Sequence, residues 1–272
     1  MSTETPSQRG PLDALLDEIG PRIVACSGGI DSLVLATVAH LRDPELTTIA
    51  HTVTPAVPSA GTARVLAHAR RNGWNLELVT SNEFSDERYL SNPTDRCYYC
   101  KTNLYDAVDA LRGGSLGDAV ILSGANTDDL GEYRPGLIAA DEHDVRHPYV
   151  EAGIAKAGIR ALAAELGLDE VDLPASPCLA SRLYTGTRVT AERLRSIEMG
   201  EAVLAEAGFA VNRCRMRGDD VLVELPEADR ERCSDELLAD VASAMQAVLP
   251  AISSVALDTR PYRSGQAVLG VV

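Results

Sequence analysis

Short apolar runs alternate with longer amphipathic segments through the first two thirds of this 272-residue chain, and no other feature constrains the fold as strongly. The apolar runs have the length of strands, and the segments between them have the pattern of helices. The expected strands are 22–26, 46–53, 75–80 and 118–124, and the expected helices are 31–41, 61–73, 101–112 and 154–167. Strands that alternate with helices predict an α/β fold, a doubly wound parallel sheet covered on both faces.

The pattern changes in the last third of the chain. We expect a helix over 190–208, a hairpin of 209–217 and 219–225, a helix over 227–249 and a last strand over 252–258. These elements predict a smaller C-terminal α+β domain with its own core. The predicted organisation is therefore a flexible tail over 1–10, an α/β domain over 11–185 and the small domain over 186–272.

The net charge argues against a general nucleic-acid-binding surface. The chain has 25 Lys and Arg against 40 Asp and Glu, a formal net charge of −15, whereas binding through phosphates needs many basic contacts. Between Arg182 and Arg217, however, seven arginines stand against four acidic residues, so this region carries +3 and the remainder −18. Such a local excess suits an anionic ligand, although surface arginines on a helix give the same count.

The sequence predicts a cytoplasmic protein that makes no use of a membrane. No N-terminal stretch has the basic start and apolar run of a signal peptide, and no apolar run reaches the roughly 18 residues that a bilayer requires. Of the six cysteines only Cys97 and Cys100 lie close together, unlike the dense spacing of a secreted disulfide scaffold. Any cysteine that matters is therefore expected to serve metal, cluster or catalytic chemistry.

The stretch "VACSGGIDSLVL" (24–35) places small and polar residues between the first expected strand and helix. Gly28 and Gly29 allow a tight turn with bare N–H groups, while Ser27 and Ser32 add hydroxyl donors at the positive end of the helix. The carboxyl ends of parallel strands are where such sheets bind ligands, so an anion is expected here. An ordinary glycine-rich turn is the plain alternative.

The same stretch contains neither the G-x-x-x-x-G-K-[ST] of P-loop enzymes nor the G-x-G-x-x-G of dinucleotide sites. It resembles the S-G-G-x-D-S loop of the PP-loop ATP pyrophosphatases. Those enzymes cleave ATP between its α- and β-phosphates and adenylate a substrate, and their loop holds the pyrophosphate that leaves.

The resemblance runs from about residue 10 to "YRSG" (262–265), and three further stretches narrow it: "RCYYCKTNLY" (96–105), "SGANTDDLGEYRPG" (123–136) and "PASPCLASR" (174–182). Together they resemble the LarE family, ATP-dependent sulfur transferases that make the thiocarboxylates of the nickel-pincer nucleotide cofactor of lactate racemase. The resemblance implies that ATP and Mg²⁺ adenylate a carboxylate of pyridinium-3,5-biscarboxylic acid mononucleotide, with release of pyrophosphate, and that sulfur then displaces AMP. It also implies a homo-oligomer, a hexamer in the family, and transfer of the product to a nickel-inserting protein.

The resemblance allows two sources of sulfur. Some members sacrifice the cysteine of the P-C-L-A-S-R motif, here Cys178, which is left as dehydroalanine; others use three cysteines to hold a 4Fe-4S cluster whose open iron carries a sulfide. Cys97, Cys100 and Cys178 fit the cluster type, because a C-x-x-C pair can meet one cluster and a third ligand leaves one iron open. A redox dithiol or two packed cysteines also match the C-x-x-C spacing.

The resemblance also assigns site residues. Those expected to bind ATP are Ser27, Gly28, Gly29, Asp31, Ser32, Gly124, Asp129 and Arg182. Asp31, Asp128 and Asp129 carry the carboxylates expected at Mg²⁺, and Lys101 is a further counter-charge. Arg213 and Arg215, two apart on one strand face, are expected to bind the substrate phosphate, with Arg217 continuing that face.

The remaining cysteines have plainer interpretations. Cys26 ends a core strand and Cys214 points away from the arginines that flank it, so both are expected to be buried, and Cys233 is expected in a polar helix. Two rival functions stay open. One is a PP-loop enzyme that thiolates tRNA, and the other is a scaffold that binds nucleotide or an iron–sulfur cluster without turnover.

Overall fold

A computed structural model describes residues 9–112, 116–131 and 134–263. The chain forms two compact units: the first contains the residues up to Asn82 together with Cys97–Ser176, and the second contains Glu83–Arg96 and the chain from Pro177 onward. The tail predicted over 1–10 lies outside the described residues, except that Arg9 and Gly10 begin a helix. Ser264 and Gly265 of "YRSG" and Glu132 and Tyr133 of "EYRPG" also lie outside them.

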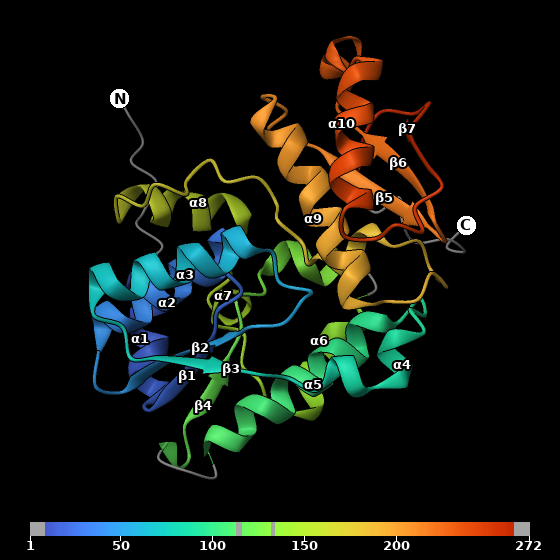
Figure 1. The fold of residues 1–272 in the computed structure, drawn as a ribbon. Coiled ribbons are helices and arrows are strands. Elements are labelled where there is room, and N and C mark those ends of the chain that lie inside the picture. The colour runs from blue at the N-terminus through green and yellow to red at the C-terminus, as the bar shows by residue number, and fades with distance from the viewer. Residues whose placement is uncertain (1–8, 113–115, 132–133, 264–272) are drawn as a thin grey trace, which may run out of the picture. The chain divides into compact units, whose positions relative to one another are not determined.

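A four-stranded parallel sheet forms the centre of the first unit, in the order β3-β2-β1-β4 (Figure 1). The strands are β1 (Arg22–Ala25), β2 (Thr47–Thr52), β3 (Leu76–Val79) and β4 (Val120–Leu122). The predicted parallel α/β sheet is confirmed. The fourth strand is shorter than the expected 118–124.

Helices cover both faces of this sheet. Val24, Ile49 and Leu122 pack into one core with α1, α2, α3, α7 and α8, whereas the neighbouring strand residues pack into a second core with α5 and α6. Alternate strand residues are thus buried on opposite faces, as expected for a parallel sheet between two helical layers. The helices are α1 (Arg9–Ile19), α2 (Ile30–Arg42), α3 (Ser59–Asn72), α5 (Arg96–Leu111), α6 (Pro135–Glu142), α7 (Pro148–Glu151) and α8 (Lys156–Glu165).

The C-terminal end of α3 agrees with the sequence prediction, and the N-terminal end of α5 differs from it. Gly73 closes α3 at φ 66°, in the left-handed conformation that glycine adopts at helix ends, so that prediction is confirmed. Helix α5 begins at Arg96 rather than at 101, because a turn in which Arg96 donates its N–H to the carbonyl of Pro93 leads directly into it. Cys97 and Cys100 consequently lie on a helix.

The second unit is a small α+β structure. Strands β5 (Arg213–Arg217) and β6 (Asp220–Glu224) form the predicted hairpin, and β7 (Ser254–Leu257) pairs parallel to β6. Helices α9 (Ala191–Glu206) and α10 (Asp235–Gln246) accompany the sheet, and the remaining helical segments are η1 (Glu83–Ser85), α4 (Glu87–Leu90), η4 (Leu179–Arg182) and η5 (Glu227–Arg232).

The single helix predicted over 227–249 is wrong. The chain forms η5, leaves helical geometry at Cys233 and Ser234, and restarts as α10. The restart has a local cause, because the Ser234 hydroxyl accepts the N–H of Leu237 and caps the new helix. Cys233 therefore lies between two helices and not inside one.

Residues 83–96 belong to the second unit through backbone pairing. The buried Asn92 side chain donates to the carbonyl oxygens of Tyr184 and Thr187 at 2.9 and 2.8 Å. The N–H groups of Gly186 and Val189 donate back to the carbonyls of Asn92 and Leu90. The sequence placed the boundary after residue 185 and this segment in the first domain; the two compact units divide at Pro177 and at both ends of the segment.

None of the described helices has the length and apolar character needed to cross a bilayer.

Candidate functional site

The loop between β1 and α2 depends on Gly28, whose φ is 81°. A Cβ at this position would lie 2.4 Å from the carbonyl oxygen of Gly61 in α3, closer than real Cβ atoms come to any backbone atom. Glycine is therefore needed both for the left-handed backbone and for the contact with α3. The turn leads straight into α2 and leaves the Ser27 side chain exposed.

Ser32, in the first turn of α2, holds this loop together. Its buried hydroxyl accepts the N–H of Ser27 at 3.1 Å and donates to the carbonyl oxygen of Gly29 at 3.0 Å. Gly29 precedes α2 with no side-chain cap among the described residues. The first N–H groups of α2 are thus left for an anion, which the helix dipole also favours.

Side chains of β2 and α3 fix the carbonyl side of the loop. Arg64 Nε donates to the Gly28 carbonyl at 3.0 Å, and His51 Nδ1 donates to the Cys26 carbonyl at 2.7 Å. Burial lowers the pKa of His51, so this imidazole is neutral. Burial also raises the pKa of Cys26 to about 11. The prediction that Cys26 is buried is confirmed.

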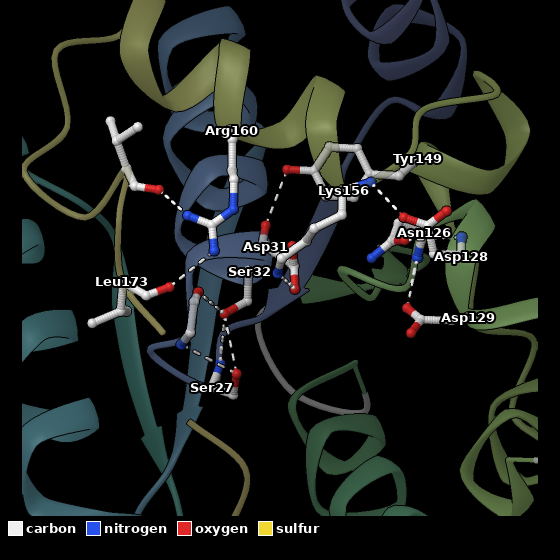
Figure 2. Close-up of polar contacts among 12 residues, drawn as sticks. Ser27, Asp31, Ser32, Asn126, Asp128, Asp129, Tyr149, Lys156, Arg160 and Leu173 are labelled. Atoms are coloured by element: carbon white, nitrogen blue, oxygen red, sulfur yellow. Dashed lines mark hydrogen bonds and ion pairs between the residues drawn. The ribbon is translucent and has the colours of Figure 1, made fainter. Parts of the chain in front are cut away.

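Asp31 faces a cation that the sequence interpretation did not single out. Lys156 Nζ lies 2.5 Å from both carboxylate oxygens of Asp31, and the Tyr149 hydroxyl donates to the Asp31 carbonyl at 3.0 Å (Figure 2). Lys156 begins α8, so the start of this helix lies beside the start of α2. An ammonium and a carboxylate therefore lie together beside the loop between β1 and α2.

The other two acidic candidates have structural partners. Asp128 accepts the backbone N–H of Lys156 at 3.0 Å, and Asp129 accepts the N–H of Asn126 (Figure 2). Asp129 also pairs with Arg134. Gly124 lies close by, since a Cβ there would be 3.0 Å from the backbone nitrogen of Ser32. The segment after β4 and the loop after β1 thus meet at the carboxyl ends of their strands, where parallel sheets bind ligands.

The C-x-x-C pair lies in the first turns of α5. Cys97 is exposed and Cys100 is partly buried, and residues three apart project from one helix face. Lys101 packs near Gly136, where a Cβ would meet the lysine Cγ at 3.0 Å. The described part of the chain holds no group of three or more His, Cys, Asp or Glu side chains close enough for a metal ion.

Cys178 immediately precedes η4 in the second unit and is partly buried. Its loop is held by Arg182, which donates to the carbonyls of Pro177 and Cys178 at 2.7 and 3.2 Å. The same guanidinium makes two hydrogen bonds of 2.9 Å to Glu201 in α9. Burial opposes the charge of Arg182, but Glu201 outweighs that effect and raises its pKa. Arg182 is thus a buried support of the cysteine loop.

The strand arginines share a face, as predicted, but differ in their surroundings. Arg215 is buried, donates to Glu224 at 2.9 Å and to the Ser181 carbonyl at 2.7 Å, and so supports the cysteine loop as well. Arg213 is partly buried and lies over the Tyr262 ring; burial and then the nearby Arg182 charge lower its pKa. Arg217 is exposed over the Tyr184 ring.

The predicted site residues therefore fall into two groups, one in each unit. The first unit brings together Ser27, Gly28, Gly29, Asp31, Ser32, Gly124, Asp128 and Asp129, and the second holds Cys178, Arg182, Arg213 and Arg215. Cys214 is fully buried, as expected. Lys156, Gly61, Arg64 and Glu201 were missed. Of these, only Lys156 carried a sequence signal, since lysine is rare in this chain.

Comparison with known proteins places the chain among its relatives. It is 31% identical over 261 residues, covering 96% of this chain and 93% of the relative, to a pyridinium-3,5-bisthiocarboxylic acid mononucleotide synthase of Lactiplantibacillus plantarum. The chain belongs to the LarE family. Uncharacterized proteins of Synechocystis (33% identity, 92% of both chains) and Methanocaldococcus jannaschii (30%, 67% of this chain and 68% of the relative) resemble this LarE-family chain as well. No protein-family model matches it.

Proposed function

We propose that this enzyme uses ATP to insert sulfur into the carboxylates of pyridinium-3,5-biscarboxylic acid mononucleotide. The name of the L. plantarum relative supports the product class. The observation that carries the proposal is the support of the cysteine loop by Arg182, which is buried, pairs with the partly buried Glu201 and donates to the carbonyls of Pro177 and Cys178.

Adenylation comes first because a carboxylate resists nucleophiles: its charge repels them, and oxide does not leave. A carboxylate oxygen forms a bond to the α-phosphorus as the bond from that phosphorus to the bridging oxygen breaks, and the electron pair leaves with pyrophosphate. The uncapped start of α2 beyond Gly28 and Gly29 suits the charge of that leaving group. The partly exposed oxygens of Asp31 suit Mg²⁺ on the nucleotide.

The substrate phosphate is assigned to Arg213. Its guanidinium is near that of Arg182, and this like charge, after burial, lowers the Arg213 pKa. A phosphate would relieve that repulsion. Arg215, the other arginine expected at the phosphate, also supports the cysteine loop through the Ser181 carbonyl.

Sulfur then replaces AMP at the activated carboxyl carbon. We assign the source of this sulfur to a 4Fe-4S cluster held by Cys97, Cys100 and Cys178. The thiols of Cys97 and Cys100 lie one turn apart on one face of α5, and three thiolate ligands would leave one iron of the cluster open. Such a cluster supplies an iron-bound sulfide. The competing source is Cys178 itself, which would lose its sulfur and become dehydroalanine.

One experiment tests both the proposed reaction and the proposed source of the sulfur. Protein reconstituted with iron and sulfide without oxygen is given ATP and the mononucleotide, and pyrophosphate, product mass and the mass of the Cys178 peptide are measured. We expect pyrophosphate, a thiocarboxylate and an unchanged Cys178 peptide, with brown absorption that is lost in Cys97→Ala. Dehydroalanine at 178 in an iron-free active enzyme would assign the sulfur to Cys178. Pyrophosphate release that depends on tRNA would overturn the substrate, and no release at all would leave a binding protein.

A further inference from the structure

We propose that Arg64 is a positioning residue for the turn between β1 and α2, and that the Glu170 carboxylate keeps Arg64 in its place. The inference rests on the ATP step of the proposed function and adds two residues to it. Both lie in the first unit, Arg64 in α3 and Glu170 in the segment that follows α8. Neither of them is part of the adenylation or sulfur steps proposed for this enzyme.

The turn depends on the orientation of one peptide group. Arg64 Nε donates to the carbonyl oxygen of Gly28 at 3.0 Å. That carbonyl belongs to the same planar trans peptide as the N–H of Gly29, which points the opposite way. Among the described residues this N–H reaches the Ser27 hydroxyl at 3.4 Å, a long contact that a phosphate oxygen can replace. By holding the carbonyl, Arg64 therefore directs the N–H toward an anion.

The two glycines make a support from outside the turn useful. A peptide between two glycines has a wide choice of backbone angles, because neither residue has a Cβ to restrict it. Gly28 is packed closely against Gly61 of α3, and Arg64 lies one turn further along the same helix. Helix α3 thus supplies both the packing surface and the hydrogen-bond donor that fix the peptide.

The Arg64 guanidinium is partly buried, and Glu170 supplies a counter-charge. Burial lowers the pKa of Arg64, and the charge of the Glu170 carboxylate opposes that effect. His68 Nε2 lies 3.0 Å from Glu170 Oε1, and the His68 ring stacks on Trp74. Glu170 Oε2 is buried and has no hydrogen-bond partner in the described part of the chain. The attraction of Arg64 offsets part of the cost of that oxygen, because Coulomb attraction does not require a hydrogen bond.

The chain on either side of Glu170 is fixed by contacts that do not involve the turn. Arg71 of α3 pairs with Asp169 at 3.4 Å. Arg160 of α8 donates to the carbonyl oxygen of Leu173 at 3.2 Å (Figure 2). The carboxylate is therefore a fixed charge, and the arginine that orients the turn is placed against it.

The sequence allows this one peptide to be observed directly. Glycine follows glycine only at 28–29 and 113–114. Deuterated protein made with glycine that carries ¹³C at the carbonyl and ¹⁵N, and with unlabelled serine, therefore gives two signals in a carbonyl-to-amide correlation spectrum. The variant Gly114→Ala removes one of them and assigns the other to the Gly28–Gly29 peptide.

The position of that signal reports the Arg64 contact without any turnover. We expect it to move in Arg64→Gln and to return most of the way in Arg64→Lys, which keeps a charged donor. The matched control is Arg71→Gln, which breaks the pair between the same helix and Asp169. In that control the signal should stay where it is in the wild type.

Calorimetry with α,β-methylene-ATP and Mg²⁺ measures what the orientation contributes to binding. Arg64→Gln should weaken binding about tenfold, the loss of one hydrogen bond from a charged donor, and Glu170→Gln should weaken it less. If Glu170 acts through Arg64, the double variant binds as weakly as Arg64→Gln alone, because the two effects are not additive. Arg71→Gln should leave the affinity unchanged.

Each failure can be recognised. If the analogue binds the wild type and Arg64→Gln equally well, or the peptide signal stays in place in Arg64→Gln, the inference is wrong and the proposed function is untouched. If the two substitutions add in the double variant, Glu170 does not act through Arg64. An equal loss of affinity in Arg71→Gln would mean that any broken pair on α3 weakens the site, and would overturn the assignment. If the analogue does not bind the wild type, the ATP step fails, and the inference fails with it.

Discussion

The contact between Gly28 and Gly61 predicts that alanine at 28 costs more than backbone strain alone. Gly28 and Gly73 have positive φ values of 81° and 66°, but a Cβ at Gly73 would meet nothing within 4 Å, whereas one at Gly28 would lie 2.4 Å from the Gly61 carbonyl oxygen. Gly73→Ala therefore carries the strain alone, about 1–2 kcal/mol. Gly28→Ala carries that strain and an overpacked contact of about 1–3 kcal/mol more.

Urea denaturation of the wild type and both variants measures this difference. The midpoint should fall further in Gly28→Ala than in Gly73→Ala, with the slope m unchanged, because the surface exposed on unfolding stays nearly the same. Only Gly28→Ala should also weaken ATP binding by calorimetry, since relieving the contact displaces the N–H groups before α2. Equal losses of stability in the two variants would refute the reasoning, because the loop could then move away from α3 without cost.

Three further substitutions probe the second unit and the support of the loop. Glu201→Gln should cost about 3–5 kcal/mol, as for other broken buried pairs, and should speed alkylation of Cys178, measured by mass spectrometry. Asn92→Ala leaves the buried Thr187 carbonyl without its donor and should cost about 1–3 kcal/mol in denaturant unfolding, whereas the Tyr184 carbonyl still accepts the Thr187 N–H. Burial lowers the His51 pKa below its ordinary 6.5, so the unfolded chain takes up the proton first. Stability should be full above that value and fall as pH decreases through it, and His51→Gln should flatten this dependence in pH-resolved denaturation.

The sequence was a good guide wherever a local pattern decides the structure. Period-two alternation along β5 correctly buried Cys214 and set Arg213 and Arg215 on one face. It could not show that Arg215 is itself buried, because that depends on Glu224 on the next strand and on the Ser181 carbonyl. The same limit hid Glu201, whose partner Arg182 is 19 residues away.

Other differences arise where one local signal competes with another. Residues 227–249 have enough helical character to suggest one helix, but the Ser234 hydroxyl offers a cap, and the chain restarts there. The C-x-x-C pair was expected before a helix and lies on one, since the turn after Pro93 extends α5 toward its N-terminus. The Lys156–Asp31 pair joins residues 125 apart, and no periodicity reports a contact over that distance.

The position of residues 83–96 has a consequence for how the protein forms in time. Asn92 hydrogen-bonds to Tyr184, 92 residues later in the chain, so during synthesis it leaves the ribosome long before its partner exists. At the usual speed of translation, about 5–20 residues per second, the interval is roughly 5–20 s. Throughout it, this segment lacks the backbone of residues 184–189, with which it hydrogen-bonds in the folded protein. The segment is thus exposed to misassembly or to a chaperone until residues 184–189 have been made and can pair with it.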